Sequence, residues 1–215
     1  MPSLRARLVS AVLRRFVKNH NRHGVAVQRN RRANRKRPSR WDASPCIATA
    51  EELGGVPSHR LTPPNADDSL VLMYLHGGAF IAGPVVLHWW FLSKLCKLTR
   101  AIGYLPDYRK APEHHCTEGF ADVERAYLAI RERHPNSRVV VLGDSAGGNL
   151  TLVLSLLLRD KGLPLPNRIA MLAPVMDATF SNPEVEKVAP FDPMLALNGV
   201  SGAARLWARD VPLDD

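Results

Sequence analysis

The sequence predicts an α/β fold in which an open, mostly parallel sheet carries helices on both faces. From Ser69 onward, short apolar runs typical of buried strands alternate with longer segments of helical periodicity. Strands and helices that alternate in this way form parallel pairs joined by right-handed crossovers. The 215 residues have a hydrophobic content of 46%, which suits one compact domain with its own core.

The first expected element is a basic amphipathic helix within the first twenty residues. Leu4, Leu8 and Val12 recur at helical spacing, with arginines between them. Residues 1–40 hold 13 of the 29 Lys and Arg side chains and none of the 20 Asp and Glu side chains. We therefore expect a basic helix and linker over 1–40, followed by the α/β domain over 41–215.

Three destinations are open for this basic helix: docking on its own domain as a lid, lying on an anionic membrane surface, or contacting nucleic acid together with the basic run Arg29–Arg40. That run contains no aromatic side chain to stack on bases. We therefore expect the run to be a solvated link, and a nucleic-acid partner is disfavoured. Peripheral membrane contact through the helix stays open.

The composition favours a cytoplasmic location. Arginines interrupt any apolar signal-peptide core near the N-terminus, and no apolar stretch approaches the roughly 18 residues that a membrane span needs. Cys46, Cys96 and Cys116 are odd in number and lack metal-ligand spacing, which favours a reducing compartment. One disulfide bond among them and an organelle transit peptide at the N-terminus stay open as alternatives.

The later elements follow in order along the chain. Pro84 marks the start of a helix, a run of valines favours a strand before Gly143, and apolar residues at helical spacing define a helix that ends before Pro135. The expected order is a strand over 69–75, a helix over 85–100, a strand over 102–105, a helix around 120–130, a strand over 138–142, a helix over 146–160 and a strand over 168–172.

The segment VVVLGDSAGGNL (Val139–Leu150) carries the strongest chemical signal. It places Ser145 between a valine-rich strand and an apolar helix. Small residues two positions before and after the serine let the backbone turn sharply and lift the hydroxyl clear of the sheet. We expect a nucleophile elbow, with Ser145 as the nucleophile and Gly143, Asp144 and Gly147 supporting the turn. A phosphate-binding loop is disfavoured because its lysine is missing.

A second motif, LMYLHGGAF (Leu72–Phe80), places His76, Gly77, Gly78 and Ala79 directly after an earlier buried strand. Glycine-rich loops at the carboxyl ends of neighbouring parallel strands converge on one site. We assign the oxyanion hole to Gly77, Gly78, Ala79 and Ala146, with the N–H groups of the last three as the donors to a tetrahedral intermediate. His76 is expected to orient this loop through hydrogen bonds rather than to act as a general base.

These two motifs, together with DYRKAPEH (Asp107–His114), resemble those of the hormone-sensitive-lipase-like serine esterases of the α/β-hydrolase superfamily. The resemblance covers roughly residues 54–193. It implies an α/β-hydrolase-type domain and a carboxylic ester hydrolase that forms a covalent acyl-enzyme on Ser145. The implied substrate is a short or medium acyl ester, and no metal or cofactor is implied.

The same resemblance implies roles for two other regions. The basic N-terminal helix looks like the lid segment that covers the acyl pocket in this family. Asp107, Arg109 and Glu113 of DYRKAPEH are implied to form a structural ion-pair and turn motif. Lys110 departs from the family, which has an apolar residue at this position.

The chain also departs from the family after the nucleophile. In this superfamily the triad acid and the triad histidine follow the serine, but all eight histidines of the chain precede Ser145. Asp177 and Asp192 follow it, and the resemblance makes Asp177 a structural or pocket-lining residue and Asp192 part of a turn, rather than the triad acid. We therefore expect a C-terminally truncated, partial domain in which the final strands, with the acid and the histidine, are missing.

This departure changes the expected function. Loss of the triad histidine costs on the order of a million-fold in the turnover of a serine hydrolase. The sequence therefore predicts an ester hydrolase that is crippled in this chain. The alternative is a protein of the same fold without catalysis, which either binds a ligand or uses its basic tail to bind an anionic partner.

Overall fold

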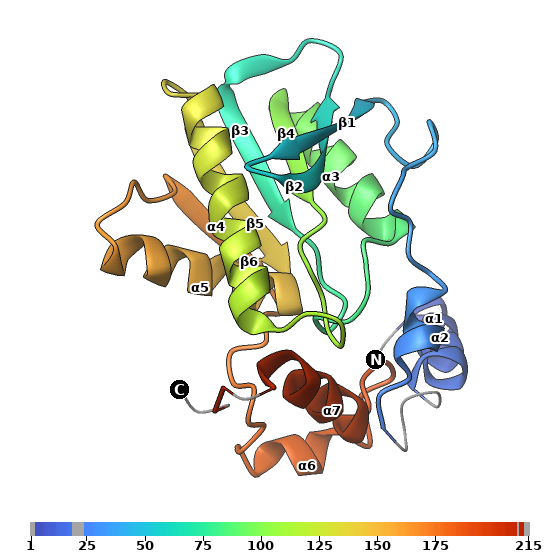
Figure 1. Ribbon diagram of the computed structural model, residues 1–215. Coiled ribbons are helices and arrows are strands. Elements are labelled where there is room, and N and C mark those ends of the chain that lie inside the picture. Colours follow the sequence, from blue (N-terminus) through green and yellow to red (C-terminus); the bar gives the residue numbers. More distant parts are fainter. Residues whose placement is uncertain (1–2, 19–23, 210, 213–215) are drawn as a thin grey trace.

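The computed structural model describes residues 3–18, 24–209 and 211–212, with the backbone alone at Phe16 (Figure 1). Its six strands form one sheet in the order β1-β2-β4-β3-β5-β6. The strands are β1 (Ile47–Leu53), β2 (Val56–Thr62), β3 (Asp67–Leu75), β4 (Ala101–Pro106), β5 (Arg138–Asp144) and β6 (Arg168–Leu172). The helices are α1 (Leu4–Phe16), α2 (Val27–Arg31), α3 (Val86–Thr99), α4 (Cys116–Arg133), α5 (Ala146–Asp160), α6 (Glu184–Val188) and α7 (Leu197–Ala208).

The predicted parallel core is confirmed. β4, β3, β5 and β6 pair in parallel, and the predicted helices connect them as α3, α4 and α5. β6 lies at the open edge of the sheet, where each of its five residues is exposed. Among the helices described, none combines the length and the apolar character that a membrane crossing requires.

The hairpin at the other edge of the sheet was not predicted. β1 and β2 pair antiparallel, and Gly54 and Gly55 connect them with φ angles of 57° and 80°. Two consecutive positive φ angles are typical of the tight turn that joins twisted antiparallel strands. The expectation that the sheet begins at residue 69 was therefore incomplete, because β1 is a largely exposed edge strand without a continuous apolar run.

Two apolar cores lie on opposite faces of the sheet. Alternate side chains of β3 point to opposite faces, as the pleat of a strand requires. Met73 packs in one core with Tyr127 of α4 and Leu154 of α5, whereas Leu72 packs in the other with Trp89 of α3. The predicted arrangement of helices on both faces of the sheet is thus present.

The remaining helices gather at one end of the sheet. Figure 1 shows α1, α2, α6 and α7 below the carboxyl ends of the parallel strands. Trp207 of α7 stacks on Phe80 at a centroid distance of 5.0 Å and packs edge-on against Phe120 of α4. Lys18, just after α1, donates hydrogen bonds to the carbonyl oxygens of Ala189 (2.5 Å) and Asp192 (2.6 Å). α1 and the segment around α6 are therefore joined at this end.

The basic run after α1 is mostly exposed, as expected for a solvated link, but it also makes fixed contacts with the domain. Arg31 and Asn34 make hydrogen bonds to backbone groups of residues 81 and 83. The indole N–H of Trp89 donates to the carbonyl oxygen of Arg35 (2.6 Å). The run is therefore solvated over most of its length and is also attached to the domain through these side chains and backbone groups. Residues 19–23 of the predicted basic segment lie outside the described residues.

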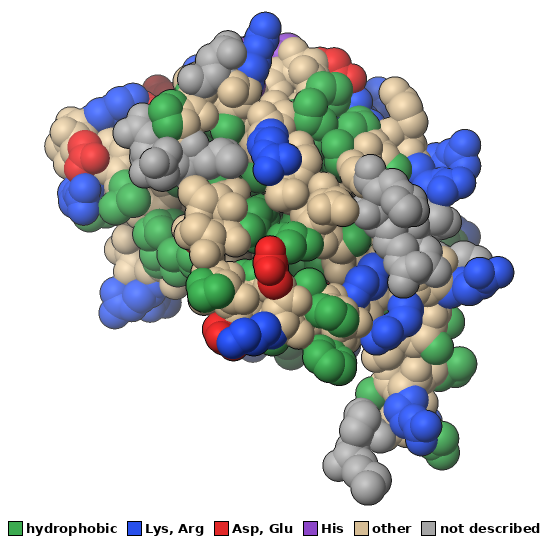
Figure 2. Space-filling model, turned by 90° about the horizontal axis from the view of Figure 1, so that it is seen from below, with side chains coloured by type: hydrophobic (Ala, Val, Ile, Leu, Met, Phe, Trp, Pro, Cys, Tyr) green, Lys and Arg blue, Asp and Glu red, His purple; other side chains and the backbone are tan. Residues whose placement is uncertain are grey.

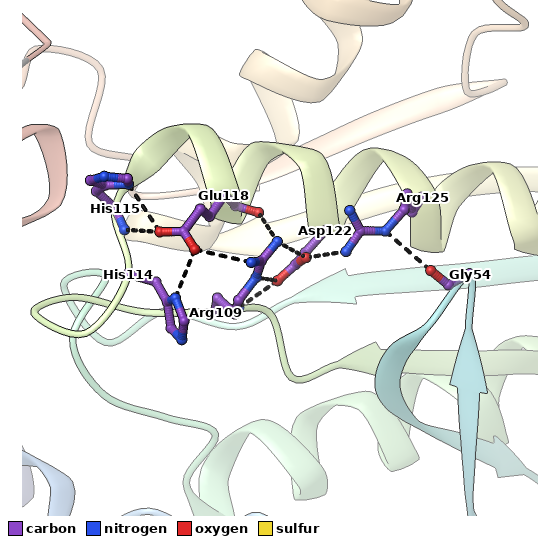
Figure 3. A network of polar contacts seen from close by, with 7 residues as sticks. All are labelled: Gly54, Arg109, His114, His115, Glu118, Asp122 and Arg125. Carbon is purple, nitrogen blue, oxygen red and sulfur yellow. Dashed lines mark hydrogen bonds and ion pairs between the residues drawn. The ribbon is translucent and has the colours of Figure 1, made fainter.

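The DYRKAPEH segment forms the ion pairs predicted for it. Figure 3 shows Arg109 between two acidic residues of α4, where it pairs with Glu118 (3.0 Å) and Asp122 (2.8 Å). The Asp107 carboxylate pairs with Lys110, and the Glu113 carboxylate pairs with Arg31. Lys110 is the residue that departs from the family pattern, and the Asp107 carboxylate, three residues before it, balances its charge.

Candidate active site

Ser145 lies at the sharp turn between β5 and α5. Its φ and ψ angles are 51° and −118°, a strained conformation for a residue with a side chain. The Ser145 N–H donates to the carbonyl oxygen of Leu172 (2.9 Å), and its carbonyl oxygen accepts hydrogen bonds from the N–H groups of Asn149 and Val175 (both 3.2 Å). Contacts from β6, α5 and the following loop therefore hold the predicted elbow in place.

The elbow also depends on the absence of a side chain at Gly147. A Cβ atom at this position would overlap the carbonyl oxygen of Leu75, at the end of β3. The Leu75 oxygen belongs to the backbone and the Cβ atom is bonded directly to the backbone at residue 147, so neither can rotate away. The overlap is relieved only by moving the helix away from the strand. Gly147 therefore lets α5 begin close against β3, which places the helix N-terminus beneath Ser145.

The residues after β3 form a tight loop, residues 77–83, which we call the oxyanion loop. Gly78, Ala79 and Phe80 have φ angles of 128°, 53° and 61°. The Gly78 carbonyl oxygen accepts hydrogen bonds from the N–H groups of Ile81 (3.1 Å) and Ala82 (3.0 Å). Within the described part of the chain, the N–H groups of Gly78 and Ala79 donate no hydrogen bond, so they are available to a ligand.

Gly77, which was assigned to the oxyanion hole but not to its donors, has its N–H engaged elsewhere. The Gly77 N–H donates to Oδ1 of Asp144 (2.8 Å), so Gly77 shapes the loop and its own N–H does not face a ligand. Ala146 is the first residue of α5, and the first N–H groups of a helix have no partner within the helix. The candidate oxyanion donors are therefore Gly78, Ala79 and Ala146.

Asp144 connects the two loops. Its Oδ1 accepts hydrogen bonds from the Tyr74 hydroxyl (2.6 Å) and the Gly77 N–H, and its Oδ2 lies 3.7 Å from Nε2 of His88. Burial of Asp144 opposes ionisation, but the contacts with His88 and Tyr74 outweigh it and lower the pKa of Asp144 to about 2. An ionised Asp144 therefore fixes the oxyanion loop against the elbow at neutral pH.

His76 is held in a loop-orienting position. Its Nδ1 donates to the Gly77 carbonyl oxygen (2.7 Å), its carbonyl oxygen accepts from the Tyr108 hydroxyl (2.7 Å), and its ring stacks on that of Tyr108 at 4.6 Å. Complete burial lowers the pKa of His76 well below its ordinary value, so the imidazole stays neutral. These contacts support the predicted structural role and do not connect His76 with the Ser145 hydroxyl.

Ser145 opens onto an apolar cavity of about 630 Å³. Its wall is formed by the oxyanion loop, by α3, by α7 and by the loops that follow β6. The lining includes Ala79, Phe80, Leu87, Trp90, Phe91, Val175, Met194, Leu195 and Val200, and Val17 joins it from the N-terminal segment. Figure 2 shows this end of the molecule, where hydrophobic side chains gather on the surface. The cavity suits an apolar acyl chain whose carbonyl group reaches Ser145.

No histidine of the described residues hydrogen-bonds the Ser145 hydroxyl. His88 lines the same cavity, but its Nδ1 accepts from the Val85 N–H (2.9 Å) and its Nε2 faces Asp144. The other described histidines have partners elsewhere: His59 with Trp89, His114 and His115 with Glu118, and His134 with Tyr104. His20 and His23 lie outside the described residues.

The two aspartates that follow the elbow have local roles. Asp177 accepts hydrogen bonds from the N–H groups of Thr179 (2.8 Å) and Ser181 (3.2 Å), and Asp192 accepts from those of Met194 and Leu195 (both 2.7 Å). Each carboxylate therefore closes a turn, which is the role predicted for Asp192 and a structural role for Asp177. Neither aspartate is among the residues that line the cavity.

Sequence reasoning missed Tyr74, His88 and Tyr108. Each contacts a site residue that is far away in the sequence: Tyr74 and His88 contact Asp144, and Tyr108 contacts His76. Tyr74 and Asp144, for example, are 70 positions apart. A polar aromatic residue within an apolar strand was a signal for Tyr74, because a buried tyrosine hydroxyl needs a hydrogen-bond partner. Tyr108 lies within the DYRKAPEH motif, but the resemblance assigned it no role, and no local pattern marks His88.

The geometry agrees with comparisons to known proteins. The family described as the alpha/beta hydrolase fold matches residues 72–215, two thirds of the chain. Versiconal hemiacetal acetate esterase stcI of Emericella nidulans is 33% identical over 124 residues, 57% of this chain and 43% of that protein. Carboxylic ester hydrolase LipN of Mycobacterium tuberculosis is 35% identical over 143 residues, 59% of this chain and 36% of that protein.

A solved structure extends the similarity. An esterase from the bacterial hormone-sensitive lipase family superposes with a TM-score of 0.74 at 29% sequence identity, covering 79% of this chain and 57% of that chain. The chain thus spans less than half the length of the two curated relatives and little more than half of the solved one.

Proposed function

Because this chain belongs to the α/β-hydrolase fold family and is similar to esterases of the hormone-sensitive-lipase type, we propose that it is a carboxylic ester hydrolase that acts through Ser145. The observation that carries the proposal is the position of Ser145 between two backbone segments with free N–H groups, at the wall of an apolar cavity. A nucleophile placed beside such donors is suited to acyl transfer.

The proposed reaction proceeds in two steps. The Ser145 hydroxyl oxygen attacks the ester carbonyl carbon, its proton passes to a base, and the N–H groups of Gly78, Ala79 and Ala146 stabilise the negative charge on the carbonyl oxygen. The alcohol then leaves with a proton and an acyl group remains on Ser145. Water attacks this acyl-enzyme, which releases the carboxylic acid and restores the hydroxyl.

The base is the component that the described residues do not supply. A serine hydroxyl is a weak nucleophile without a neighbouring base. In serine hydrolases that lack a triad residue, the oxyanion hole and substrate binding alone still accelerate the reaction about a thousandfold over its rate in water. We therefore propose that this chain carries the nucleophile and oxyanion part of the site and turns over esters slowly by itself.

The cavity supports a short or medium acyl ester as the substrate. Its wall is largely apolar, and a polar acyl chain would lose hydrogen bonds with water on entry. Ligand binding without turnover is the second candidate function. The observation that favours it is that the cavity is formed while no described histidine reaches Ser145.

We propose a cytoplasmic location, which rests on the odd number of cysteines and on their lack of metal-ligand spacing. We also propose that α1 makes peripheral contact with an anionic membrane surface. Leu4 and Leu8 of α1 are 81% and 68% exposed, and neighbouring arginines supply the charge that such a surface attracts. A nucleic-acid partner is not proposed.

Imidazole added as an external base tests the proposed function. Hydrolysis of p-nitrophenyl acetate and p-nitrophenyl butyrate is measured with increasing imidazole for the chain and for Ser145→Ala. We expect imidazole to accelerate hydrolysis about tenfold or more above the Ser145→Ala rate, because it can take the serine proton that no described histidine reaches. Equal acceleration of both proteins would show that Ser145 takes no part, and the proposal would fail.

A further inference from the structure

The oxyanion loop has a conformation that its own residues disfavour. Ala79 and Phe80 both have positive φ angles, a left-handed conformation that is unfavourable for a residue with a side chain. Strained backbone persists only where surrounding contacts determine it. The two hydrogen bonds to the Gly78 carbonyl oxygen close the turn from within, so the contacts that fix its position on the domain must come from outside the loop.

Arg31 supplies such contacts from the N-terminal segment. Its Nε donates to the carbonyl oxygen of Ile81, in the oxyanion loop, and its Nη2 donates to that of Ala111 (both 2.7 Å). Its Nη1 and Nη2 also form a two-pronged pair with the Glu113 carboxylate (both 2.6 Å). One guanidinium group thus joins the oxyanion loop to residues 111–113.

The surrounding contacts make the arrangement specific. The Ala111 N–H donates to the Phe80 carbonyl oxygen (3.0 Å), so the two segments that Arg31 joins also touch directly. The Asn34 side-chain oxygen accepts from the Gly83 N–H (2.7 Å), and the Arg35 N–H donates to the Pro84 carbonyl oxygen (2.5 Å). Residues 31–35 are therefore bonded to the oxyanion loop at residues 81 and 83 and to residue 84 directly after it.

The chemistry of the Arg31 contacts requires a guanidinium group. Two carbonyl oxygens and a carboxylate lie around one planar group, and the directions of the four N–H groups that bond them are fixed relative to one another. The hydrogen bond from Arg31 lowers the pKa of Glu113 to about 2, so the pair is fully charged at the pH of ester hydrolysis. A lysine has one point charge and cannot reproduce this set of contacts.

We propose that Arg31 is a positioning residue for the oxyanion hole, because its guanidinium holds the Ile81 carbonyl oxygen and thereby fixes the direction of the Gly78 and Ala79 N–H groups. Its effect on turnover rests on the proposed function, whereas its effect on the loop does not. Arg31 lies within a run of basic residues, and it differs from its neighbour Arg32 in lying against the loop rather than in solvent.

The test compares Arg31→Met and Arg31→Lys with Arg32→Met as the matched control. Hydrogen–deuterium exchange is followed separately for peptides that contain residues 77–83 and residues 25–35. Imidazole-supported hydrolysis of p-nitrophenyl acetate gives kcat and KM. Arg31→Met keeps the length and the apolar stem of the side chain, and the Glu113 it leaves behind is half exposed, so we expect the variant to fold.

We expect exchange of residues 77–83 to become about tenfold faster in Arg31→Met, with an intermediate change in Arg31→Lys and no change in Arg32→Met. kcat should fall about tenfold or more while KM changes less than about twofold, since misplaced donors weaken the transition state more than ground-state binding. Faster exchange confined to residues 25–35, or equal effects of Arg31→Met and Arg32→Met, would overturn the proposal.

The two readouts separate this proposal from the proposed function. If the imidazole-supported hydrolysis of the wild type does not depend on Ser145, the proposed function fails, and the exchange data still decide whether Arg31 holds the loop. If hydrolysis depends on Ser145 but neither kcat nor loop exchange responds to Arg31→Met and Arg31→Lys, the positioning role fails alone. A thermal melt of each variant identifies any general loss of folding. If Arg31→Met is unfolded, the exchange and kinetics of Arg31→Lys decide whether Arg31 has the positioning role.

Discussion

Replacing Asp122 with alanine is expected to destabilise the protein by about 3 kcal/mol, because it removes a buried carboxylate that pairs with two arginines. Asp122 is 3% exposed. It accepts hydrogen bonds from the backbone and the guanidinium of Arg109 and from the guanidinium of Arg125 (Figure 3). The two arginines are partly exposed, so water offsets part of the loss. Thermal unfolding should show a midpoint about 10 °C lower.

The matched control is Asp160→Ala. Asp160 pairs with Arg159 at the end of α5, and both side chains are mostly exposed. Exposed ion pairs contribute little to stability, so we expect a change below about 0.5 kcal/mol. Equal melting midpoints for Asp122→Ala and Asp160→Ala would contradict the structural role of the DYRKAPEH ion pairs.

Replacing Gly147 with alanine is expected to destabilise the protein by about 3 kcal/mol or more, because one methyl group would overlap the Leu75 carbonyl oxygen. Two backbone segments would have to separate, which moves α5 away from β3 and displaces the Ala146 N–H. Denaturant unfolding measures the loss of stability. The imidazole-supported assay should show a parallel loss of serine-dependent turnover.

Gly202→Ala is the control for this change. Gly202 lies within α7, and the nearest atom to a Cβ added there is 3.5 Å away, an ordinary contact. Alanine within a helix is more favourable than glycine by about 0.5–1 kcal/mol, so we expect no loss of stability. A Gly147→Ala variant as stable as the wild type would show that the elbow tolerates a side chain and would argue against the close approach of α5 to β3.

Much of the sheet was predictable because buried parallel strands are apolar over their whole length. β3 and β5 cover the segments 69–75 and 138–142 predicted for them, with small differences at the ends. The β1–β2 hairpin escaped prediction because its strands carry Glu51, Glu52 and Pro57 and because β1 lies at the edge of the sheet. The Gly54-Gly55 turn was the one local sign of this hairpin.

In the candidate site, too, the residues of local motifs were predictable and the contacts between distant segments were not. Ser145 and the oxyanion loop were predicted because local motifs determine a sharp turn and a glycine-rich loop. The contact between Arg31 and Ile81 spans 50 residues, and that between Tyr108 and His76 spans 32. Such pairings depend on how the chain folds back on itself, so nothing in the basic run set Arg31 apart from Arg32 before the structure was known.

The most direct test of the account is the hydrolysis of p-nitrophenyl butyrate without imidazole by the chain and by Ser145→Ala. In a serine hydrolase, the loss of one essential member of the triad costs about as much as the loss of all of them. If Ser145 has its oxyanion donors but no base, the two proteins should hydrolyse the ester at rates within about threefold of each other. A serine-dependent rate a thousandfold or more above that of Ser145→Ala would show that a base does reach the hydroxyl, and the account would be wrong.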